Sequence, residues 1–451
     1  MKIETILGIS GVSIDTRTLS PGDIFVAIQG AHFNGHDFIG AAIEKGAAMI
    51  ISSQPSNEFN SASCPILIVN DTIKALGELA YFHRMKFDMP IIAITGSNGK
   101  TTVKTMVGAI FSQHGLALVT QGNFNNEIGL PLTLLQLKQD HEVAILEMGA
   151  RHAGDIEYLC KLAKPTITLV NNVMPAHLEC FGSLEGVAKA KGEIYEALSK
   201  EGFAILNSDS IGCAYFKTIT AKKNLISFGL NLANKPEVTA KNIEHLESGI
   251  RFILVTPVGE VAIVCPAAGQ HNVLNALAAS SIALAAGIGL KDIAKGLAQF
   301  SNVGGRLQQK KTLAGTALID DTYNANPGSF EAAIEVLATA LGSKILVMGE
   351  MAELGEAAKV LHEHIGQYAK NKGIDRLFAV GQLCEYAVKG FGSGAQLYKD
   401  KSMLIKALKA VLDHNTTCLV KGSRSAKMET VVQSLLNNHN QNNHNQTIGE
   451  Y

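Results

Sequence analysis

The sequence predicts an α/β protein of three domains, from its length, its composition and its alternation of strand-like and helix-like segments. The chain has 451 residues, and at roughly 150 residues per domain this length corresponds to about three domains. Hydrophobic residues make up 47% and charged residues 18%, which is ordinary for a globular protein and excludes a disordered or fibrous chain. From residue 90 onward, short apolar runs alternate with longer helical segments. This alternation is typical of a mainly parallel sheet covered by helices on both faces.

The first domain is expected at 1–88, as a small α/β unit of short apolar runs separated by turn-rich stretches. The second, at 89–303, is expected to be a P-loop type sheet built from PIIAIT, VAILEM, TITLV and FAILN. The third, at 304–434, repeats the strand–helix pattern and predicts a Rossmann-like unit. The remaining 435–451 is rich in Asn, Gln and His and offers almost nothing to bury, so we expect a disordered tail.

Two segments of the central domain need separate interpretation. The run RFILVTPVGEVAIVC at 251–265 is divided by a Pro-Val-Gly break, which predicts a β-hairpin. The stretch from Val261 to Leu290 has no charged residue and is long enough to cross a bilayer. Its interior, however, contains Pro, Gly, Gln, His and Asn, and the rest is largely Ala and Ser. We therefore predict a buried helix and no membrane association.

Charge and cysteine content exclude further classes. The 39 Lys and Arg nearly balance the 40 Asp and Glu, for a net charge of −1, so no overall positive field exists to attract nucleic acid. The seven cysteines are scattered and never spaced as CxxC, which disfavours a disulfide framework and a zinc site. The N-terminus lacks the long apolar run of a secretory signal. We expect a cytoplasmic protein, and since no self-complementary patch is evident, a monomer.

The strongest local motif is TGSNGKTT at 95–102, which follows a β-branched strand and opens a helix. This order is what a phosphate cradle needs, because loop N–H groups and a helix N-terminus surround phosphate oxygens. Lys100 would add positive charge, and Thr101 a hydroxyl for Mg²⁺. Ile94 stands where the strict P-loop pattern has its first Gly, so a tight structural turn is the alternative.

Polar residues also follow the next predicted strands. Glu147 ends VAILE, where it could ligate Mg²⁺ or simply cap the strand, and His177 lies in the loop after TITLV. Lys191 lies in a helical segment with nothing intrinsic to distinguish it. Asn272, in GQHNVLNA, could either cap a helix or contact an adenine edge.

The last third contains a second polar group of residues. Arg306 could stabilise the charge of a transferring phosphate, and Asp321 could bind a ribose or help to hold Lys and Mg²⁺. The Asn-rich turn after Asp321 is equally explained as a structural turn. The loop KGSR at 421–424 could bind a carboxylate or be a solvated basic loop.

Taken together and in order, these motifs resemble the Mur ligase family of ATP-dependent amide-forming enzymes in peptidoglycan precursor synthesis. The resemblance covers nearly the whole chain: the motifs that carry it are DTR, PGDIFVAIQG, TGSNGKTT, LEMGA, His177 with Lys191, GQHNVLNA, GRLQ and KGSR. Three segments, GNFNNEIGLPLT, DDTYNANPGS and VKGSRSAKME, resemble the family member that adds D-alanyl-D-alanine to UDP-N-acetylmuramoyl-tripeptide. The resemblance implies ATP and Mg²⁺, with two ions, as cofactors and those two molecules as substrates.

The resemblance also implies roles for individual residues. The nucleotide would be bound by Gly96, Ser97, Asn98, Gly99, Lys100, Thr101, Thr102, Asn272, Arg306 and Asp321. One Mg²⁺ would be ligated by Thr101 and Glu147, the other by His177 and by Lys191 after carbamylation of its amine. Lys100, His177, Lys191 and Arg306 would serve catalysis. Substrates would be bound by Asp15, Thr16, Arg17, Asn125, Asn126, Glu127, Asn324, Asn326, Lys421 and Arg424.

Two alternatives stay open on the sequence. A folylpolyglutamate synthase or another Mur ligase shares the phosphate loop and the activation chemistry, although folylpolyglutamate synthase would lack the segments NFNNEIGLP and YNANP. The second alternative is a nucleotide-binding scaffold that has lost catalysis. This alternative is disfavoured because all the residues with proposed catalytic or metal-binding roles are present: Lys100, Glu147, His177, Lys191 and Arg306. Whether the third acceptor residue is diaminopimelate or lysine is not encoded in any motif recognised here.

Overall fold

The computed structural model describes residues 10–30, 33–55, 64–175, 178–246 and 249–436. The N-terminal part of the chain forms a four-stranded parallel sheet in the order β1-β2-β3-β4. Its strands are β1 (Val12–Ser13), β2 (Ile24–Val26), β3 (Met49–Ser52) and β4 (Ile66–Ile68), with helices α1 (Ile39–Glu44) and α2 (Thr72–Arg84). All residues of β2 and β3 are buried, because helices or neighbouring segments cover both faces.

The central part of the chain is built on a six-stranded sheet, ordered β10-β9-β8-β5-β7-β6 and parallel throughout. The strands are β5 (Ile91–Thr95), β6 (Leu116–Val119), β7 (His141–Glu147), β8 (Ile167–Val170), β9 (Phe203–Asn207) and β10 (Asn224–Phe228). From β5 the chain goes to the edge strand β6, returns to β7 beside β5, and then crosses to β8 on the other side of β5. Ligands of open parallel sheets bind beyond the strand ends at such a reversal.

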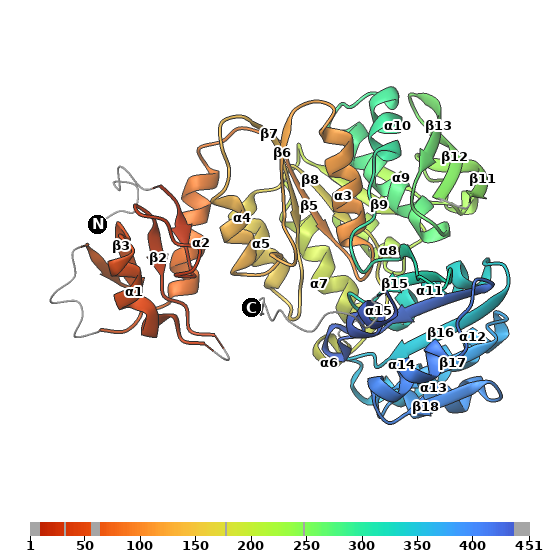
Figure 1. The fold of residues 1–451 in the computed structure, drawn as a ribbon. Helices are drawn as coiled ribbons and strands as arrows, with labels where there is room; N and C mark the ends of the chain where they lie inside the picture. Colours follow the sequence, from red (N-terminus) through yellow and green to blue (C-terminus); the bar gives the residue numbers. More distant parts are fainter. Residues whose placement is uncertain (1–9, 31–32, 56–63, 176–177, 247–248, 437–451) are drawn as a thin grey trace. The chain divides into compact units, whose positions relative to one another are not determined.

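Helices cover both faces of the central sheet, as predicted (Figure 1). One face packs against α3 (Lys100–Phe111), α9 (Gln270–Ala285) and α10 (Leu290–Ala298). The other packs against α4 (Gly129–Leu134), α5 (Asp155–Ala163), α7 (Leu184–Glu196) and α8 (Cys213–Ile219). The two cores share β5, whose residues alternate between them: Ile92 and Ile94 face one core, and Ile91 and Ala93 the other.

The predicted hairpin is present and belongs to a larger element. Strands β12 (Gly249–Thr256) and β13 (Gly259–Cys265) pair antiparallel, and β11 (Thr239–Leu246) adds a third strand that the sequence did not predict. The uncharged segment forms the end of β13 and the buried helix α9, which confirms the prediction of a buried helix. No helix in the described ranges is long and apolar enough to span a membrane.

The C-terminal part of the chain has a mixed six-stranded sheet, ordered β14-β15-β19-β16-β17-β18. Its strands are β14 (Gln308–Lys311), β15 (Ala317–Asp321), β16 (Ser343–Gly349), β17 (Arg376–Val380), β18 (Ala395–Tyr398) and β19 (Thr416–Lys421). Only β14 is antiparallel to its neighbour. The helices are α11 (Pro327–Ala338), α12 (Ala358–Asn371), α13 (Cys384–Phe391), α14 (Lys401–Lys409) and α15 (Glu429–Leu436). These three α/β sheets confirm the predicted fold class.

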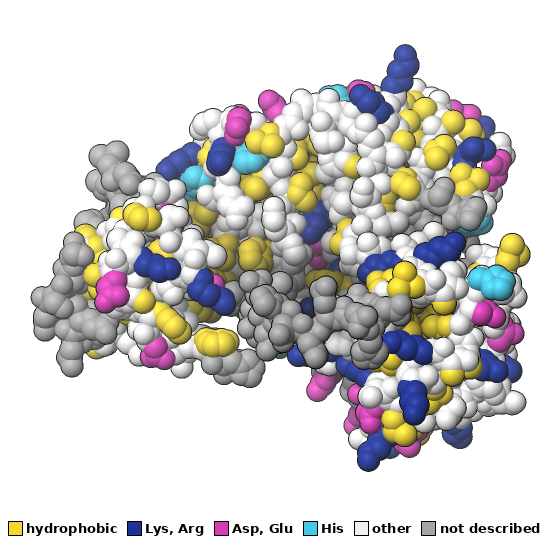
Figure 2. All heavy atoms as spheres, in the orientation of Figure 1, with side chains coloured by type: hydrophobic (Ala, Val, Ile, Leu, Met, Phe, Trp, Pro, Cys, Tyr) yellow, Lys and Arg dark blue, Asp and Glu magenta, His cyan; other side chains and the backbone are white. Residues whose placement is uncertain are grey.

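The chain divides into two compact units, 1–301 and 302–451. Helix α15 includes residues 435 and 436, the first two of the expected tail, and the rest of that tail lies outside the described residues. All seven cysteines lie in described ranges, and all are free thiols. On the face drawn in Figure 2, basic and acidic side chains are interspersed, in keeping with the net charge of −1.

Candidate functional site

The motif TGSNGKTT forms a loop between the central strand β5 and helix α3. Gly99, the residue before α3, has φ +77°, a left-handed conformation that favours glycine. A Cβ at this position would lie 2.5 Å from the side chains of both Asn171 and Asn275. The motif therefore needs Gly99 for two reasons. Its backbone conformation favours glycine, and the side chains of Asn171 and Asn275 leave no room for a Cβ.

Asn172, just after β8, fixes the first half of this loop. Its carbonyl accepts a hydrogen bond from the Ser97 amide (3.0 Å), and its side-chain oxygen accepts one from the Asn98 amide (2.8 Å). These two N–H groups, which the sequence predicts to bind phosphate, donate to Asn172 in this structure, and phosphate binding by them stays a prediction. The first turn of α3 follows directly, and a helix N-terminus favours anions.

Asparagine side chains connect this loop to the start of α9. The Asn171 amide donates to the Asn98 carbonyl and to the Asn275 side-chain oxygen, both at 3.0 Å. Asn275 in turn donates to Asn272 (2.9 Å), which donates to the Ala268 carbonyl (2.7 Å). The side chain of Asn272 thus has two partners inside the protein, and adenine binding by this residue stays a prediction.

Glu147, at the end of β7, lies beside the loop as predicted for a strand end in a parallel sheet. It is buried, and its carboxylate accepts hydrogen bonds from the Thr101 hydroxyl (2.8 Å) and the Asn125 amide (2.9 Å). Burial would raise the pKa of Glu147, but the charges of Lys100 and Lys104 and these hydrogen bonds outweigh it and lower that pKa. The carboxylate is therefore held in its charged form.

This donor set fits Mg²⁺. The Thr101 hydroxyl and the Glu147 carboxylate lie within hydrogen-bond distance of each other, and hard oxygen ligands of this kind are the ones Mg²⁺ prefers. The described residues contain no cluster of three or more His, Cys, Asp or Glu side chains that would hold a metal. A cation here would accordingly be completed by substrate phosphates and water, as is usual for Mg²⁺ at nucleotide sites.

Lys191 lies on α7 with its side chain buried at 3% relative exposure. Burial, together with the positive charge of Lys100, lowers the pKa of Lys191 to about 7. No ion pair within the described part of the chain includes this lysine. Nothing in the sequence around Lys191 indicates this environment. His177, expected to act beside it, lies outside the described residues.

Two predicted acceptor-binding segments have well-defined geometry. After β1, the Arg17 guanidinium binds the Asp15 carboxylate (2.8 and 3.0 Å), and the Thr16 carbonyl accepts from Lys45 (2.7 Å). Near α4, the exposed Asn126 side chain accepts from the Gly129 amide at the helix start (2.9 Å), and the neighbouring Glu127 is exposed.

The predicted residues of the C-terminal unit form a cluster at the ends of β15 and β19. Lys421 is buried and forms an ion pair with Asp321 at 2.5 Å. The KGSR loop could bind the carboxylate of a ligand, but Lys421 already contacts a carboxylate of the chain itself. The Lys421 amine also donates to the Asn324 carbonyl (3.0 Å). The Arg306 guanidinium lies over the Tyr323 ring, 4.1 Å from its centroid.

The last two predicted residues of this unit differ in exposure and role. Asn326 is the N-cap of α11 and accepts from the Ser329 amide (2.9 Å) in a capping box. Arg424 is exposed and pairs with Glu429 at 3.3 Å. Of the two, the exposed guanidinium is the more accessible to a ligand.

One functional candidate was missed by sequence reasoning. Lys104 is buried next to Glu147, 3.4 Å from its carboxylate. Lys104 follows Lys100 by four residues, a spacing that places both on one helix face. This spacing could have identified it.

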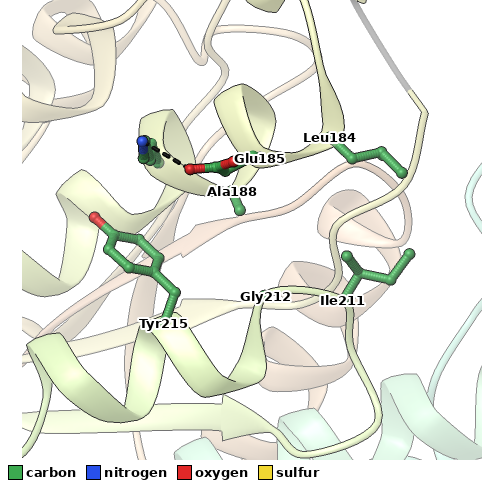
Figure 3. Close-up of a pocket in the computed structure, with 7 residues that line it drawn as sticks. Leu184, Glu185, Ala188, Ile211, Gly212 and Tyr215 are labelled. Carbon is green, nitrogen blue, oxygen red and sulfur yellow. Dashed lines mark ion pairs between the residues drawn. The ribbon is translucent and has the colours of Figure 1, made fainter.

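A pocket of about 320 Å³ opens between α7 and the segment that begins α8 (Figure 3). Leu184, Glu185, Ala188 and Lys189 line it from α7, and Ile211, Gly212 and Tyr215 line it from the other side. Glu185 and Lys189 form an ion pair of 2.8 Å at its edge. None of the residues predicted to bind substrate or nucleotide lines this pocket, so it contributes nothing to the site described above.

A glycine-bearing loop from a central parallel strand to a helix, with a lysine, a threonine and a buried carboxylate beside it, defines a phosphate-loop nucleotide-binding protein. Comparison with family models narrows this class: residues 8–84 match the Mur ligase family catalytic domain, 94–283 the Mur ligase middle domain, and 305–424 the Mur ligase glutamate ligase domain. The chain belongs to the Mur ligase family.

Individual relatives match over nearly their full length. The chain is 43% identical to the UDP-N-acetylmuramoyl-tripeptide–D-alanyl-D-alanine ligase of Escherichia coli, over 95% of this chain and 94% of that protein. Among solved structures, it is similar to MurF from Acinetobacter baumannii, with a TM-score of 0.88, 36% identity and coverage of 94% and 93%. It is also similar to MurF from Thermotoga maritima in complex with ADP, with a TM-score of 0.84, 28% identity and coverage of 94% and 96%.

Proposed function

We propose that this chain is an ATP-dependent ligase that joins D-alanyl-D-alanine to UDP-N-acetylmuramoyl-tripeptide in peptidoglycan precursor synthesis. The observation that carries the proposal is the 43% identity, over nearly both full lengths, to a relative named for this activity. The phosphate loop, the buried Glu147 and the three α/β sheets supply the structural parts that such a reaction needs. A cytoplasmic location and a monomeric state are part of the proposal.

The reaction requires activation because a carboxylate is a poor acyl donor to an amine at neutral pH. In the proposed first step, the terminal carboxylate of the tripeptide attacks the γ-phosphorus of ATP, and the bond from that phosphorus to the bridging oxygen breaks to release ADP. In the second, the amine of D-alanyl-D-alanine attacks the acyl phosphate, and phosphate leaves from the tetrahedral intermediate. The amine loses a proton as the amide forms.

The central sheet and its helices would bind the nucleotide. The first turn of α3 and Lys100 would hold the β- and γ-phosphates, while Thr101 and Glu147 would hold Mg²⁺. When bound, Mg²⁺ neutralises phosphate charge that develops during transfer. Asn272 would lie near adenine. A second Mg²⁺, held by His177 and by carbamylated Lys191, is part of the proposal.

Lys191 is proposed to be carbamylated, as the family resemblance implies. The ammonium form first loses a proton, and the neutral amine then reacts with CO₂ to form a carbamate and release a second proton, so the side chain changes from a cation to an anion. Its burial supports this proposal, because the cationic form loses solvation there. A carbamate signal in ¹³C NMR after exposure to ¹³C-bicarbonate, absent from Lys191→Arg, would support it, and absence of the signal from the wild-type protein would contradict it.

The segments 15–17 and 125–127 are proposed to bind the acceptor substrate. Asp15, Thr16 and Arg17 would contact the uridine diphosphate end of the acceptor, and Asn126 and Glu127 its peptide end. Asn125 would act through Glu147, which its amide contacts at 2.9 Å.

In the C-terminal unit, Arg306 would face transferring phosphate, and Asn324, Asn326 and Arg424 would contact the dipeptide. Asp321 would lie near the nucleotide ribose and be held there by Lys421. The buried ion pair of 2.5 Å supports the part of this proposal in which Lys421 holds Asp321 in place.

The deciding experiment measures phosphate release from ATP and Mg²⁺ with each substrate alone and with both together. Release that needs both UDP-N-acetylmuramoyl-tripeptide and D-alanyl-D-alanine, with a pentapeptide product by mass spectrometry, is the expected result. Acceptors with diaminopimelate or lysine at the third position, tested separately, would settle that specificity. ATP binding without release under either acceptor would contradict the proposed substrates, and a folate acceptor would then be tested.

A further inference from the structure

Lys104 is a second lysine on α3, one turn beyond Lys100, and the proposed chemistry does not use it. It is buried at 4% relative exposure, whereas Lys100 is only partly buried. Lysine is almost never buried this far without a partner. The Lys104 amine donates to the carbonyl of Thr120 (2.7 Å) and lies 3.4 Å from the Glu147 carboxylate.

Thr120 closes a set of contacts among three elements. It directly follows β6, and its amide donates to the Ile145 carbonyl on β7 (3.0 Å). Its hydroxyl accepts a hydrogen bond from the Glu147 amide (3.1 Å). Lys104, Thr120 and Glu147 therefore join α3, the end of β6 and the end of β7 at one point beside the phosphate loop.

The two lysines of α3 have different surroundings. The Lys100 amine donates to the Gly96 carbonyl in the phosphate loop (2.7 Å), where a phosphate would attract it. The Lys104 amine instead contacts the Thr120 carbonyl and the Glu147 carboxylate directly, although the charges of both lysines act on Glu147. The side chains of Thr101 and Asn125, which donate hydrogen bonds to this carboxylate, are both neutral. A buried carboxylate without a nearby cation is strongly destabilised, and Lys104 is the cation in direct contact with it.

We propose that Lys104 is a positioning residue that fixes the Glu147 carboxylate beside Thr101 and thereby determines how well the nucleotide site holds Mg²⁺. The inference deepens the proposed function and rests on its Mg²⁺ and nucleotide site. Lys104 touches no reacting atom in this role. It acts by holding one ligand in place through the contacts with Thr120 and Glu147.

The experiment measures ADP binding by calorimetry at increasing Mg²⁺ concentration, using the full-length protein. Lys104→Met removes the charge with little change in volume, and Lys104→Arg keeps the charge but cannot reproduce the placement of the amine. The control is Lys161→Met, which breaks an exposed ion pair with Glu157 of 2.7 Å on α5. Thermal unfolding of each variant establishes whether it is folded.

Lys104→Met is expected to raise the Mg²⁺ concentration for half-maximal ADP binding about 10-fold, comparable to the loss of a ligand-orienting contact. Lys104→Arg should raise it by a smaller factor, roughly 2- to 3-fold, and Lys161→Met should leave it unchanged. A folded Lys104→Met protein with wild-type Mg²⁺ dependence would overturn the proposal, as would an equal loss of ADP binding with and without Mg²⁺. If Lys104→Met does not fold, an unchanged Mg²⁺ dependence in Lys104→Arg overturns it.

This test is independent of the acceptor and the dipeptide. A wild-type protein that binds ADP with Mg²⁺ but releases no phosphate with both substrates would refute the proposed function. The same titration would still decide the role of Lys104.

Discussion

Asp321 and Lys421 are direct neighbours on the parallel strands β15 and β19, and their side chains meet in an ion pair of 2.5 Å. They are 100 residues apart in sequence. The Lys421 side chain is 2% exposed, and that of Asp321 12%. The Asp321 carboxylate also accepts a hydrogen bond from the Leu307 amide (3.1 Å), which ties the segment that carries Arg306 to the strand end.

Breaking this pair should destabilise the C-terminal unit. Lys421→Met leaves a buried carboxylate without its cation, which typically costs about 3–5 kcal/mol. Denaturant unfolding should show this loss, and the double variant with Asp321→Asn should recover a large part of it. Lys372→Met, which breaks an exposed pair of 3.1 Å with Glu335, is the control. Equal stability of Lys421→Met and wild type would contradict the assignment.

Lys100→Ala should abolish turnover and leave the fold intact. The substitution removes a partly buried side chain at the helix surface, so we expect little change in thermal unfolding. It also removes the phosphate-loop charge, and losses on the order of 10³-fold or more in kcat/KM are typical of such electrostatic contacts. Phosphate release with both substrates measures the effect. Activity within 10-fold of wild type would exclude Lys100 from phosphate binding.

Gly99→Ala should impair nucleotide binding more than its single methyl group suggests. The new Cβ would lie 2.5 Å from Asn171 and Asn275 in a backbone conformation of φ +77°. The loop must shift, at a cost of about 1–3 kcal/mol, so ADP affinity should fall roughly 10-fold or more. Gly154→Ala, with φ +92° but no neighbour within 4 Å, separates the backbone effect from the collision. Similar ADP affinity in Gly99→Ala and wild type would contradict the expected shift of the loop.

His362, buried on α12, should make the stability of the C-terminal unit depend on pH. Its Nδ1 donates to the Ala358 carbonyl (2.7 Å), and its Nε2 accepts from the Met351 amide (3.0 Å), which requires the neutral ring. Burial lowers the pKa of His362, and the Ala358 carbonyl and Glu350 offset part of that effect. Because the unfolded chain binds the proton more tightly, this contribution is present above about pH 6.5 and is lost as pH falls toward the lower folded-state pKa.

Thermal unfolding from pH 7.5 to 5.5 tests this dependence. The midpoint of the wild-type protein should fall more steeply with decreasing pH than that of His362→Gln. His36 and His83 also have lowered pKa values because of burial, but they are common to both proteins and cancel in the difference. Parallel curves for the two proteins would show that His362 does not titrate on unfolding.

The sequence predicted the parts of the fold whose signals are local. Buried strands such as β5 and β7 read as continuous apolar runs, and the phosphate loop carries its own glycines and lysine. The strands that were missed, β1, β6, β10, β11, β14 and β18, are only partly buried along much of their length. Each lies at the edge of its sheet, where one neighbour and partial burial suffice. These short or partly polar segments lack the continuous apolar run of a central strand.

The candidate site was predictable only as residue types, and its pairings were not. Asn171 and Asn275 are 104 residues apart, and nothing in either segment indicates their hydrogen bond. Lys421 was expected in a loop open to a ligand, and its partner Asp321 becomes evident only when β15 and β19 align. Long-range contacts of this kind depend on the register of strands, which single segments do not encode.

Asn172 holds the phosphate loop in place through hydrogen bonds from the Ser97 and Asn98 amides, which form without any ligand. A loop already fixed by the neighbouring strand end loses little conformational entropy when phosphate arrives, so more of the interaction energy appears as affinity. The ordering of the loop is instead part of folding the central sheet. Substitutions at Asn172 should therefore lower the affinity for nucleotides in general. Two nucleotides that differ only in their base should lose affinity to a similar extent.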